Sequence, residues 1–236
     1  MNISLTSKVI LGLASMADGL SDWIDVLSSK KYIVYGYPKN TTRIRKTLES
    51  LGSIGDIEKQ VDSDGNISYR LTSAGWDKLS LTVPFFRFLN KPWDKLWRIV
   101  IYDIPEEQRK ERRRLRIKLK TLGFGQWQRS VWVSPHPVNE FIKDFIKSSD
   151  LSSFCRFYEA RDLFGQEKEI AGSLWNLGKL NDSYEKLYKR LIEPEPDKKA
   201  IYEDYKRLVM RDPGLPHDLL PNPWFAFLVR KKLSLL

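Results

Sequence analysis

Four basic residues in the middle of the sequence have the type and spacing that phosphate binding uses. Arg109, Arg113, Arg116 and Lys120 recur every three or four residues, so on a helix their charges form one stripe. Residues 91–160 hold 15 of the 40 lysines and arginines but only 9 of the 30 acids, within a net charge of +10. A charged helix face is often simply solvated, yet this one-sided charge favours a surface for a polyanionic partner.

A helix between two strands must position this basic stripe. No glycine or proline interrupts residues 106–120, which predicts an amphipathic helix. An aromatic and β-branched strand is predicted before it at 97–102, Gly123 supplies a helix stop, and 124–134 is predicted to resume as strand. The predicted buried face of the helix carries Leu115, Leu119 and Leu122. This β-α-β order predicts a small ferredoxin-like module.

The N-terminal third has the element order of a winged helix-turn-helix. Helices are predicted at 7–18, 22–29 and 41–51, followed by strands at 54–61 and 67–71. Asp64-Gly65 lies between the two strands and is a typical hairpin signal. This order predicts a domain that binds double-stranded DNA.

The third helix of this domain is the predicted recognition helix. Its predicted buried face is formed by Ile44, Leu48 and Leu51, which leaves several polar and basic residues for bases and phosphates. The predicted DNA contacts are Thr42, Arg43, Arg45 and Lys46 on the helix, with Lys59 and Arg70 on the hairpin. Small helical domains with a few exposed cations also bind partner proteins, but the charge here lies at the DNA-facing end.

An acid stands where the first central strand ends. Asp103 follows the strand in Tyr102-Asp-Ile-Pro105, and Glu106 comes three residues later. This spacing favours a cap on the basic helix, where both carboxylates would complement the helix dipole.

Motifs from all three parts of the chain together resemble the PaaX family, which is named for repressors of phenylacetate degradation. They are Leu71-Thr-Ser-Ala-Gly75; Trp97-Arg-Ile-Val-Ile-Tyr-Asp-Ile-Pro105 with Arg112-Arg-Arg-Leu-Arg116, Leu122-Gly-Phe-Gly125 and Val131-Trp-Val-Ser-Pro135; and Arg211-Asp-Pro-Gly-Leu-Pro216 with Leu219-Leu-Pro-Asn-Pro-Trp224. The resemblance implies three domains, a homodimer, operator binding by the N-terminal domain, and in some members release by an acyl-coenzyme A ligand. The third helix has fewer arginines than the family pattern suggests, and no motif marks a coenzyme A pocket.

The central module also resembles the small CRISPR-associated endonucleases, which are ferredoxin-like homodimers. The acid at the end of their first strand corresponds to Asp103 here. The resemblance implies an alternative in which two symmetry-related copies of Asp103 hold Mg²⁺ and activate water. One acid per protomer favours the helix cap. Asp103 is therefore a catalytic and metal-binding residue only in this alternative.

The remaining composition limits the classes of protein. Cys155 is the one cysteine, which excludes an internal disulfide and fits the cytoplasm, and no apolar run is long enough to span a membrane. His136 and His217 lie in separate proline-containing loops without metal-ligand spacing. The last third predicts helices at 170–177, 182–192, 200–211 and 224–233.

The expected protein is therefore an α+β, multidomain chain. Its domains are a winged helix-turn-helix at 1–90, a ferredoxin-like dimerisation domain at 91–165 and a helical C-terminal domain at 166–236. The leading hypothesis is a sequence-specific, homodimeric DNA-binding transcriptional regulator that acts as a repressor and needs no cofactor. The alternatives are a Mg²⁺-dependent endonuclease centred on Asp103 and a non-enzymatic CRISPR-related nucleic-acid scaffold.

Overall fold

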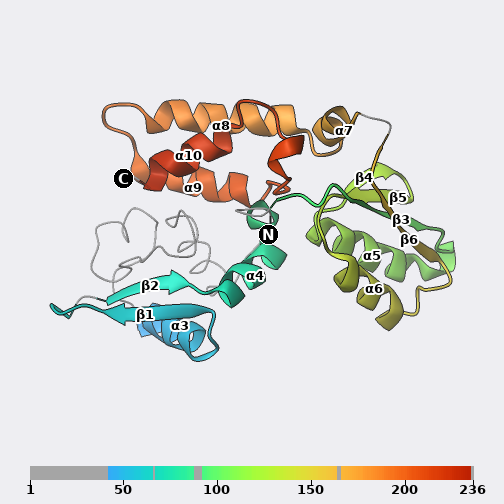
Figure 1. Cartoon of the computed structure of the whole chain (residues 1–236), viewed down its shortest axis with the longest axis horizontal. Coiled ribbons are helices and arrows are strands. Elements are labelled where there is room, and N and C mark those ends of the chain that lie inside the picture. Colours follow the sequence, from blue (N-terminus) through green and yellow to red (C-terminus); the bar gives the residue numbers. More distant parts are fainter. Residues whose placement is uncertain (1–41, 66, 88–91, 164–165, 235–236) are drawn as a thin grey trace. The chain divides into compact units, whose positions relative to one another are not determined.

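The computed structural model describes residues 42–65, 67–87, 92–163 and 166–234 (Figure 1). By its contacts the chain divides into two compact units. The first combines the N-terminal part up to Phe86 with Leu180–Arg211 and the segment from Pro223, and the second combines Arg87–Lys179 with Asp212–Asn222. The helical C-terminal third thus contributes to both units. The helices predicted at 7–18 and 22–29 lie outside the described residues.

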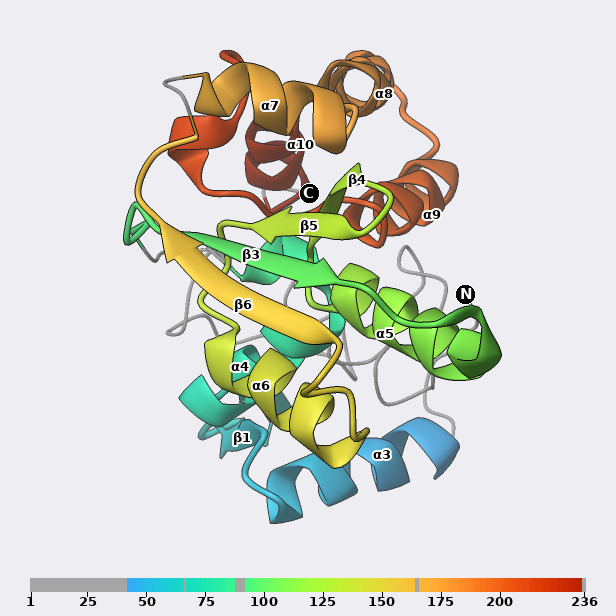
Figure 2. The same ribbon diagram turned by 90° about the vertical axis from the view of Figure 1, so that its right-hand side faces the viewer.

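The second unit contains a four-stranded antiparallel sheet with two helices on one face (Figure 2). Its elements follow the order β3 (Trp97–Tyr102), α5 (Arg109–Thr121), β4 (Gly125–Gln128), β5 (Val131–Ser134), α6 (Asn139–Ser148) and β6 (Cys155–Ala160). The strand order across the sheet is β4-β5-β3-β6. Ile99 of β3 pairs with Val133 of β5 on one side and Tyr158 of β6 on the other. This is the β-α-β-β-α-β ferredoxin-like arrangement, which confirms the predicted central module.

The core of the second unit lies between this sheet and the two helices. Successive side chains of a strand point to opposite faces, so Val100 and Tyr102 of β3 face the helices. They are buried against Leu115 and Leu119 of α5 and Ile142 of α6. The predicted leucine face of the basic helix is therefore confirmed.

Two predicted boundaries in this module are wrong. Residues 124–134 form a hairpin of β4 and β5, not one strand, because the chain turns through Arg129 and Ser130. The basic helix does not begin at Glu106: a 3₁₀ turn, η2 (Glu106–Gln108), follows Pro105, and α5 begins at Arg109. The fixed φ of Pro105 starts this turn and delays the α-helix.

Aromatic side chains cover part of the other face of the sheet. Trp97 points away from the helices and is fully buried, with the ring of Trp93 at 5.6 Å and that of Trp175 at 6.5 Å. Trp175 directly follows α7 (Glu167–Leu174) and lies against Gly125, where an added Cβ would be 2.9 Å from its ring. Toward the far end of β3 this face is open, and Ile101 and Tyr158 are exposed.

The described N-terminal part of the first unit begins with helix α3 (Thr42–Ser53). A two-stranded hairpin of β1 (Ile57–Val61) and β2 (Ile67–Leu71) follows, and then α4 (Ser73–Thr82) and the 3₁₀ turn η1 (Pro84–Phe86). The hairpin turns at Gly65, whose φ of +79° is the left-handed conformation that glycine adopts without strain. The predicted buried face of the helix is confirmed, because Ile44, Leu48 and Leu51 are each at most 2% exposed.

The Leu71-Thr-Ser-Ala-Gly75 motif joins the hairpin to α4. The Thr72 hydroxyl accepts from the Gly75 amide as the cap of α4 and donates to the Gly55 carbonyl at 2.6 Å. A Cβ on Gly75 would lie 2.0 Å from the carbonyl oxygen of Asp56, so only glycine fits there. The buried Asp56 carboxylate pairs with Lys78 at 2.5 Å. The motif therefore locks α4 against the turn that follows α3.

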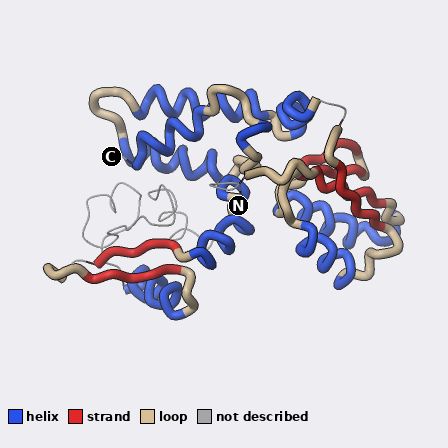
Figure 3. Tube along the Cα trace, viewed as in Figure 1, coloured by secondary structure: helices blue, strands red, loops and turns tan. Residues whose placement is uncertain are grey.

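Three helices complete the first unit, coloured blue with the other helices in Figure 3: α8 (Leu177–Leu191), α9 (Lys198–Val209) and α10 (Phe225–Ser234). Their buried side chains include Tyr184, Tyr202 and Tyr205. Arg190 joins α8 to α9 through Asp204 at 2.7 Å, and Asn181 accepts from the first amide of α10. All four helices predicted in the C-terminal third are present. In the described part of the chain, no helix has the length and apolarity to cross a membrane.

Candidate nucleic-acid interface and arginine hollow

Helix α3 and the β1-β2 hairpin bring most of the predicted DNA contacts to one exposed surface. Thr42, Arg45 and Lys46 are exposed on α3, opposite its buried leucines, and Lys59 is exposed on β1. Arg45 and Lys59 line the same hollow of about 420 Å³, together with Tyr69. The structure thus places cations of the helix and of the hairpin side by side. Arg43 also belongs to α3.

Acidic residues of the hairpin and of α3 influence two residues of this surface. Arg70 forms an ion pair with Glu58 across the two strands at 2.7 Å, so its charge is partly offset. Burial and the nearby Glu49 raise the pKa of the Tyr69 hydroxyl, so it stays a neutral hydrogen-bonding group.

The predicted basic stripe divides into two parts. Arg109, Arg113 and Lys120 are exposed along α5 as predicted. Arg116 is half-buried, and its guanidinium donates to the Gln126 side chain of β4 at 3.5 Å. All four residues lie on α5, and Arg116 is the half-buried one among them.

Asp103 is exposed at the end of β3, where its backbone amide donates to the Phe154 carbonyl at 2.9 Å. The predicted cap is wrong, because Pro105 and Gln108 occupy the cap positions of η2 and α5, and neither element has a side-chain cap hydrogen bond. Asp103 instead lines two neighbouring hollows.

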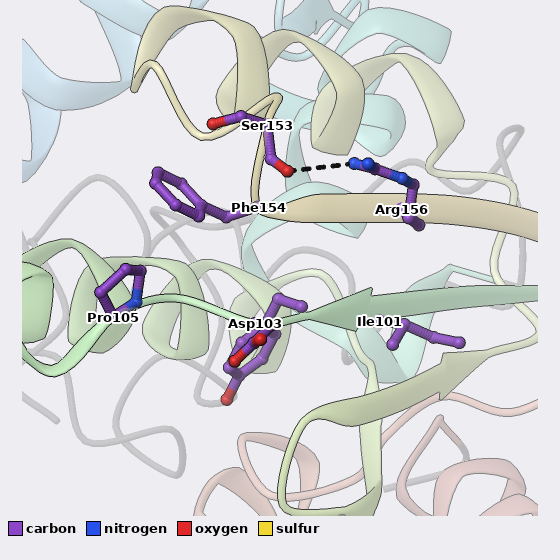
Figure 4. A pocket seen from close by; sticks show the side chains of 7 residues that line it. Ile101, Asp103, Pro105, Ser153, Phe154 and Arg156 are labelled. Carbon is purple, nitrogen blue, oxygen red and sulfur yellow. Dashed lines mark hydrogen bonds between the residues drawn. The ribbon is translucent and has the colours of Figure 1, made fainter.

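The first hollow, of about 520 Å³, is formed by β3, β6 and the segment before β6 (Figure 4). Figure 4 shows Ile101 on β3, Asp103 just beyond the end of that strand, and Arg156 on the neighbouring strand. Arg156 donates to the carbonyls of Ser153 and Cys155 at 3.2 and 2.9 Å. These bonds hold the guanidinium near its own backbone.

The second hollow, of about 360 Å³, is named here the arginine hollow, because Arg112, Arg116 and Arg129 line it together with Asp103. Arg112 donates to Glu106 at 2.5 Å. That bond, with the further positive charges of Arg109 and Arg129, holds the pKa of the Glu106 carboxyl below its usual range. The hollow therefore concentrates positive charge around one exposed acid.

The residues around Asp103 do not fit a Mg²⁺ site within one protomer. Mg²⁺ is held by several oxygen ligands, of which carboxylates are the charged ones. Asp103 is the one carboxylate that lines either hollow, whereas four arginines line them. No group of three potential metal ligands occurs among the described residues. Guanidinium charges repel a dication, so we derive no metal-dependent step from this geometry.

A set of basic residues in the same unit is buried: the neutral His136 and the two cations Arg87 and Arg98. His136 is fully buried, and its Nε2–H donates to the Pro213 carbonyl at 2.9 Å, which joins the residue after the Val131–Pro135 motif to the Arg211–Pro216 motif. Burial and the charges of Arg87 and Arg98 hold the pKa of His136 well below its usual value, so the ring is neutral. Burial also lowers the pKa of Arg87 to about 10. Its guanidinium donates to the Thr121 carbonyl.

Arg98 is the most fully bonded of these buried cations. It is 3% exposed and donates to the Asp94 carboxylate at 2.5 and 2.9 Å and to Asn139 at 2.9 Å. Sequence reasoning missed both Arg98 and Arg129. Arg98 lies inside an apolar strand pattern, and Arg129 lies in a turn without glycine or proline, so neither belongs to a periodic pattern.

Comparison with known proteins supports the central module most directly. Residues 90–171 match the family model described as the PaaX protein central Cas2-like domain. A solved structure of an uncharacterized protein, Rv0674 from Mycobacterium tuberculosis, is similar with a TM-score of 0.52 and 22% identity. The match covers 98% of this chain and 93% of that one, and shows a shared fold. A search of curated proteins found no significant match.

Proposed function

We propose that the chain, whose residues 90–171 match the central Cas2-like domain of PaaX proteins, is a transcriptional regulator that binds double-stranded DNA as a homodimer and represses transcription. Helix α3 would enter the major groove and the β1-β2 hairpin would contact the adjacent backbone. Release of the DNA by an acyl-coenzyme A ligand belongs to the same proposal by family resemblance.

The observation that carries the proposal is the shared exposed surface of α3 and the hairpin. Arg45 and Lys46 are exposed on α3, away from its buried residues, and Lys59 of β1 lines the same hollow as Arg45. A helix of 12 residues with one apolar face and one basic face suits a major groove, where arginine can contact guanine and lysine can contact phosphate. The family match of the central domain and the basic surface of α3 both support a regulator that binds DNA.

The homodimer would use the open part of the sheet in the second unit. Ile101 and Tyr158 are 39% and 51% exposed on the face away from α5 and α6, and Val131 pairs with Ile101 in the same row. Exposed apolar patches of this kind favour contact with another protein surface, and a two-fold axis matches the patch with itself. A dimer also supplies two DNA-binding domains for two half-sites, about one helical turn apart.

The dimer is tested by changing the patch. Ile101→Glu should shift the protein from dimer to monomer in light scattering, because it places a charge in the contact. Ile117→Glu is the matched control, since Ile117 is 55% exposed on α5, away from this face. An unchanged mass for Ile101→Glu, or an equal shift for both variants, would place the contact elsewhere.

DNA binding is tested by retention of genomic duplexes at increasing salt. The double variant Arg45→Ala/Lys46→Ala should lose retention and keep the dimer. The control Lys186→Ala/Lys189→Ala removes the same charge from the exposed side of α8 and should retain the same duplexes. Running each sample with Mg²⁺ and with EDTA also tests the alternative endonuclease: cleavage that needs Mg²⁺ and disappears in Asp103→Asn would support it.

A further inference from the structure

The arginine hollow has the composition of an anion site. Arg112 and Arg116 stand one turn apart on α5, and Arg129 approaches from the turn between β4 and β5. Like charges one helical turn apart repel each other. The three arginines around one concave site therefore repel each other in the absence of an anion. An anion bound between them would remove this repulsion.

The hollow is also held in shape by its surroundings. The Tyr102 hydroxyl donates to the Arg129 carbonyl at 3.1 Å, and the Tyr102 amide donates to the Ser130 carbonyl at 3.1 Å. The side-chain amide of Gln126 donates to the Arg129 carbonyl at 3.3 Å. Because the turn that carries Arg129 is fixed to β3 and β4, an anion would enter a site whose backbone is already in place.

The charges in the hollow are only partly neutralised. Arg112 pairs with Glu106, but within the described part of the chain Arg116 and Arg129 form no ion pair. Guanidinium groups bind phosphate oxygens through paired hydrogen bonds, and several around one group can match its three oxygens. The convergence distinguishes this site from Arg109 and Arg113, which are exposed along the helix.

We propose that the arginine hollow binds the phosphate or diphosphate group of a small ligand, with Arg116 and Arg129 as its principal contacts and Arg112 as a third. A hollow of about 360 Å³ suits a compact anionic group. In the empty site Glu106 forms an ion pair with Arg112. This ion pair breaks when an anion binds to Arg112. Asp103 also lines the hollow, and its negative charge opposes a bound anion, so binding depends on the three arginines together. The site is independent of the surface on α3, so it stands whether or not that surface binds DNA.

The test is calorimetric titration of the full chain with inorganic diphosphate and, separately, inorganic phosphate, at constant low ionic strength. The double variant Arg116→Gln/Arg129→Gln should weaken diphosphate binding by about tenfold or more, because two charge-assisted contacts are lost. The control Arg109→Gln/Arg113→Gln removes the same charge from the same helix outside the hollow, and should change the affinity less than about twofold. Glu106→Gln should tighten binding, since it releases Arg112 while preserving the surface elsewhere.

Each other outcome overturns the proposal. No binding of either probe to the wild-type protein would show that the hollow is not an anion site. Equal losses in the two double variants would show that net charge alone attracts the probe. A parallel titration with a short single-stranded oligonucleotide gives the last case: if Arg116→Gln/Arg129→Gln weakens only that titration, the arginines contact a nucleic-acid backbone and not a small ligand. Circular dichroism melting of every variant shows that losses of affinity are not losses of fold.

Discussion

The second unit uses arginine in two opposite ways. Arg98, which is 3% exposed, is matched by the Asp94 carboxylate, by Asn139 and by backbone carbonyls. Arg116 and Arg129 converge on a hollow open to solvent and have no ion pair among the described residues. The difference shows where the same side chain stabilises the fold and where it is available for a ligand. A buried guanidinium requires protein partners for its hydrogen-bond donors. Water can satisfy the donors of an exposed guanidinium until a ligand replaces it.

The largest effect is expected at Gly123, where the backbone lies against the buried side chains of Arg87 and His136. In Gly123→Ala the new Cβ would lie 2.4 Å from Arg87 Nη1 and 2.6 Å from His136 Cδ2, at a φ of +83°. Steric overlap and left-handed strain together should lower the free energy of unfolding by about 3 kcal/mol in urea titrations. Gly172→Ala is the control, because nothing lies near its added Cβ and alanine favours the helix by about 0.5–1 kcal/mol. Equal stability of the two variants would contradict the close packing around Gly123.

Removing the best-bonded cation should have the next largest effect. Arg98→Met leaves Asn139 and the Pro135 carbonyl without their donor and should lower the free energy of unfolding by about 2 kcal/mol. The same measurement on Arg113→Met, at an exposed position, should change stability by less than about 0.5 kcal/mol. If both substitutions had the same cost, the contrast between buried and exposed arginines would fail.

A pH effect should mark the buried histidine. Burial and the charges of Arg87 and Arg98 depress the pKa of His136 in the folded protein, so below about pH 6.5 the unfolded chain takes up a proton that the folded one refuses. Stability should therefore fall as the pH falls, by about 1 kcal/mol from pH 6.5 to 5.5.

Denaturant titrations at several pH values measure this loss. In His136→Gln, where the side-chain amide can still donate to Pro213, the part of the slope due to His136 should disappear. His217→Gln, at an exposed position, is the control measured in parallel. A wild-type slope in His136→Gln would mean that other groups cause the pH dependence.

The smallest effect is expected in the arginine hollow. Arg129→Gln should change the free energy of unfolding by less than about 0.5 kcal/mol, because its charge forms no ion pair among the described residues. A thermal or urea melt measures this value. A loss of about 2 kcal/mol would show that Arg129 stabilises the fold, as Arg98 does, and would contradict the contrast between Arg98 and the arginines of the hollow.

Periodicity predicted the regular parts of the fold. The spacing of Leu115 and Leu119 placed the core face of α5, and that of Ile44 and Leu48 placed the core face of α3. Both helices repeat their apolar residues over several turns, so the local pattern is sufficient. The C-terminal helices were predictable for the same reason.

Local patterns could not predict the hollow or the buried cations. The turn at Arg129 has no glycine or proline to separate β4 from β5, so the two strands looked like one. The bond between His136 and Pro213 joins residues far apart in the chain. Asp103 matched a capping pattern, but Pro105 begins a 3₁₀ turn between it and α5. These features depend on tertiary contacts that spacing does not encode.

The most direct test of the proposed function is the salt-dependent retention of genomic duplexes by the wild-type protein and by Arg45→Ala/Lys46→Ala. The wild-type protein should retain a two-fold-related sequence that the variant loses, while Lys186→Ala/Lys189→Ala retains it and all three stay dimeric. Equal retention by all three proteins would contradict the assignment of α3 as the DNA-binding helix.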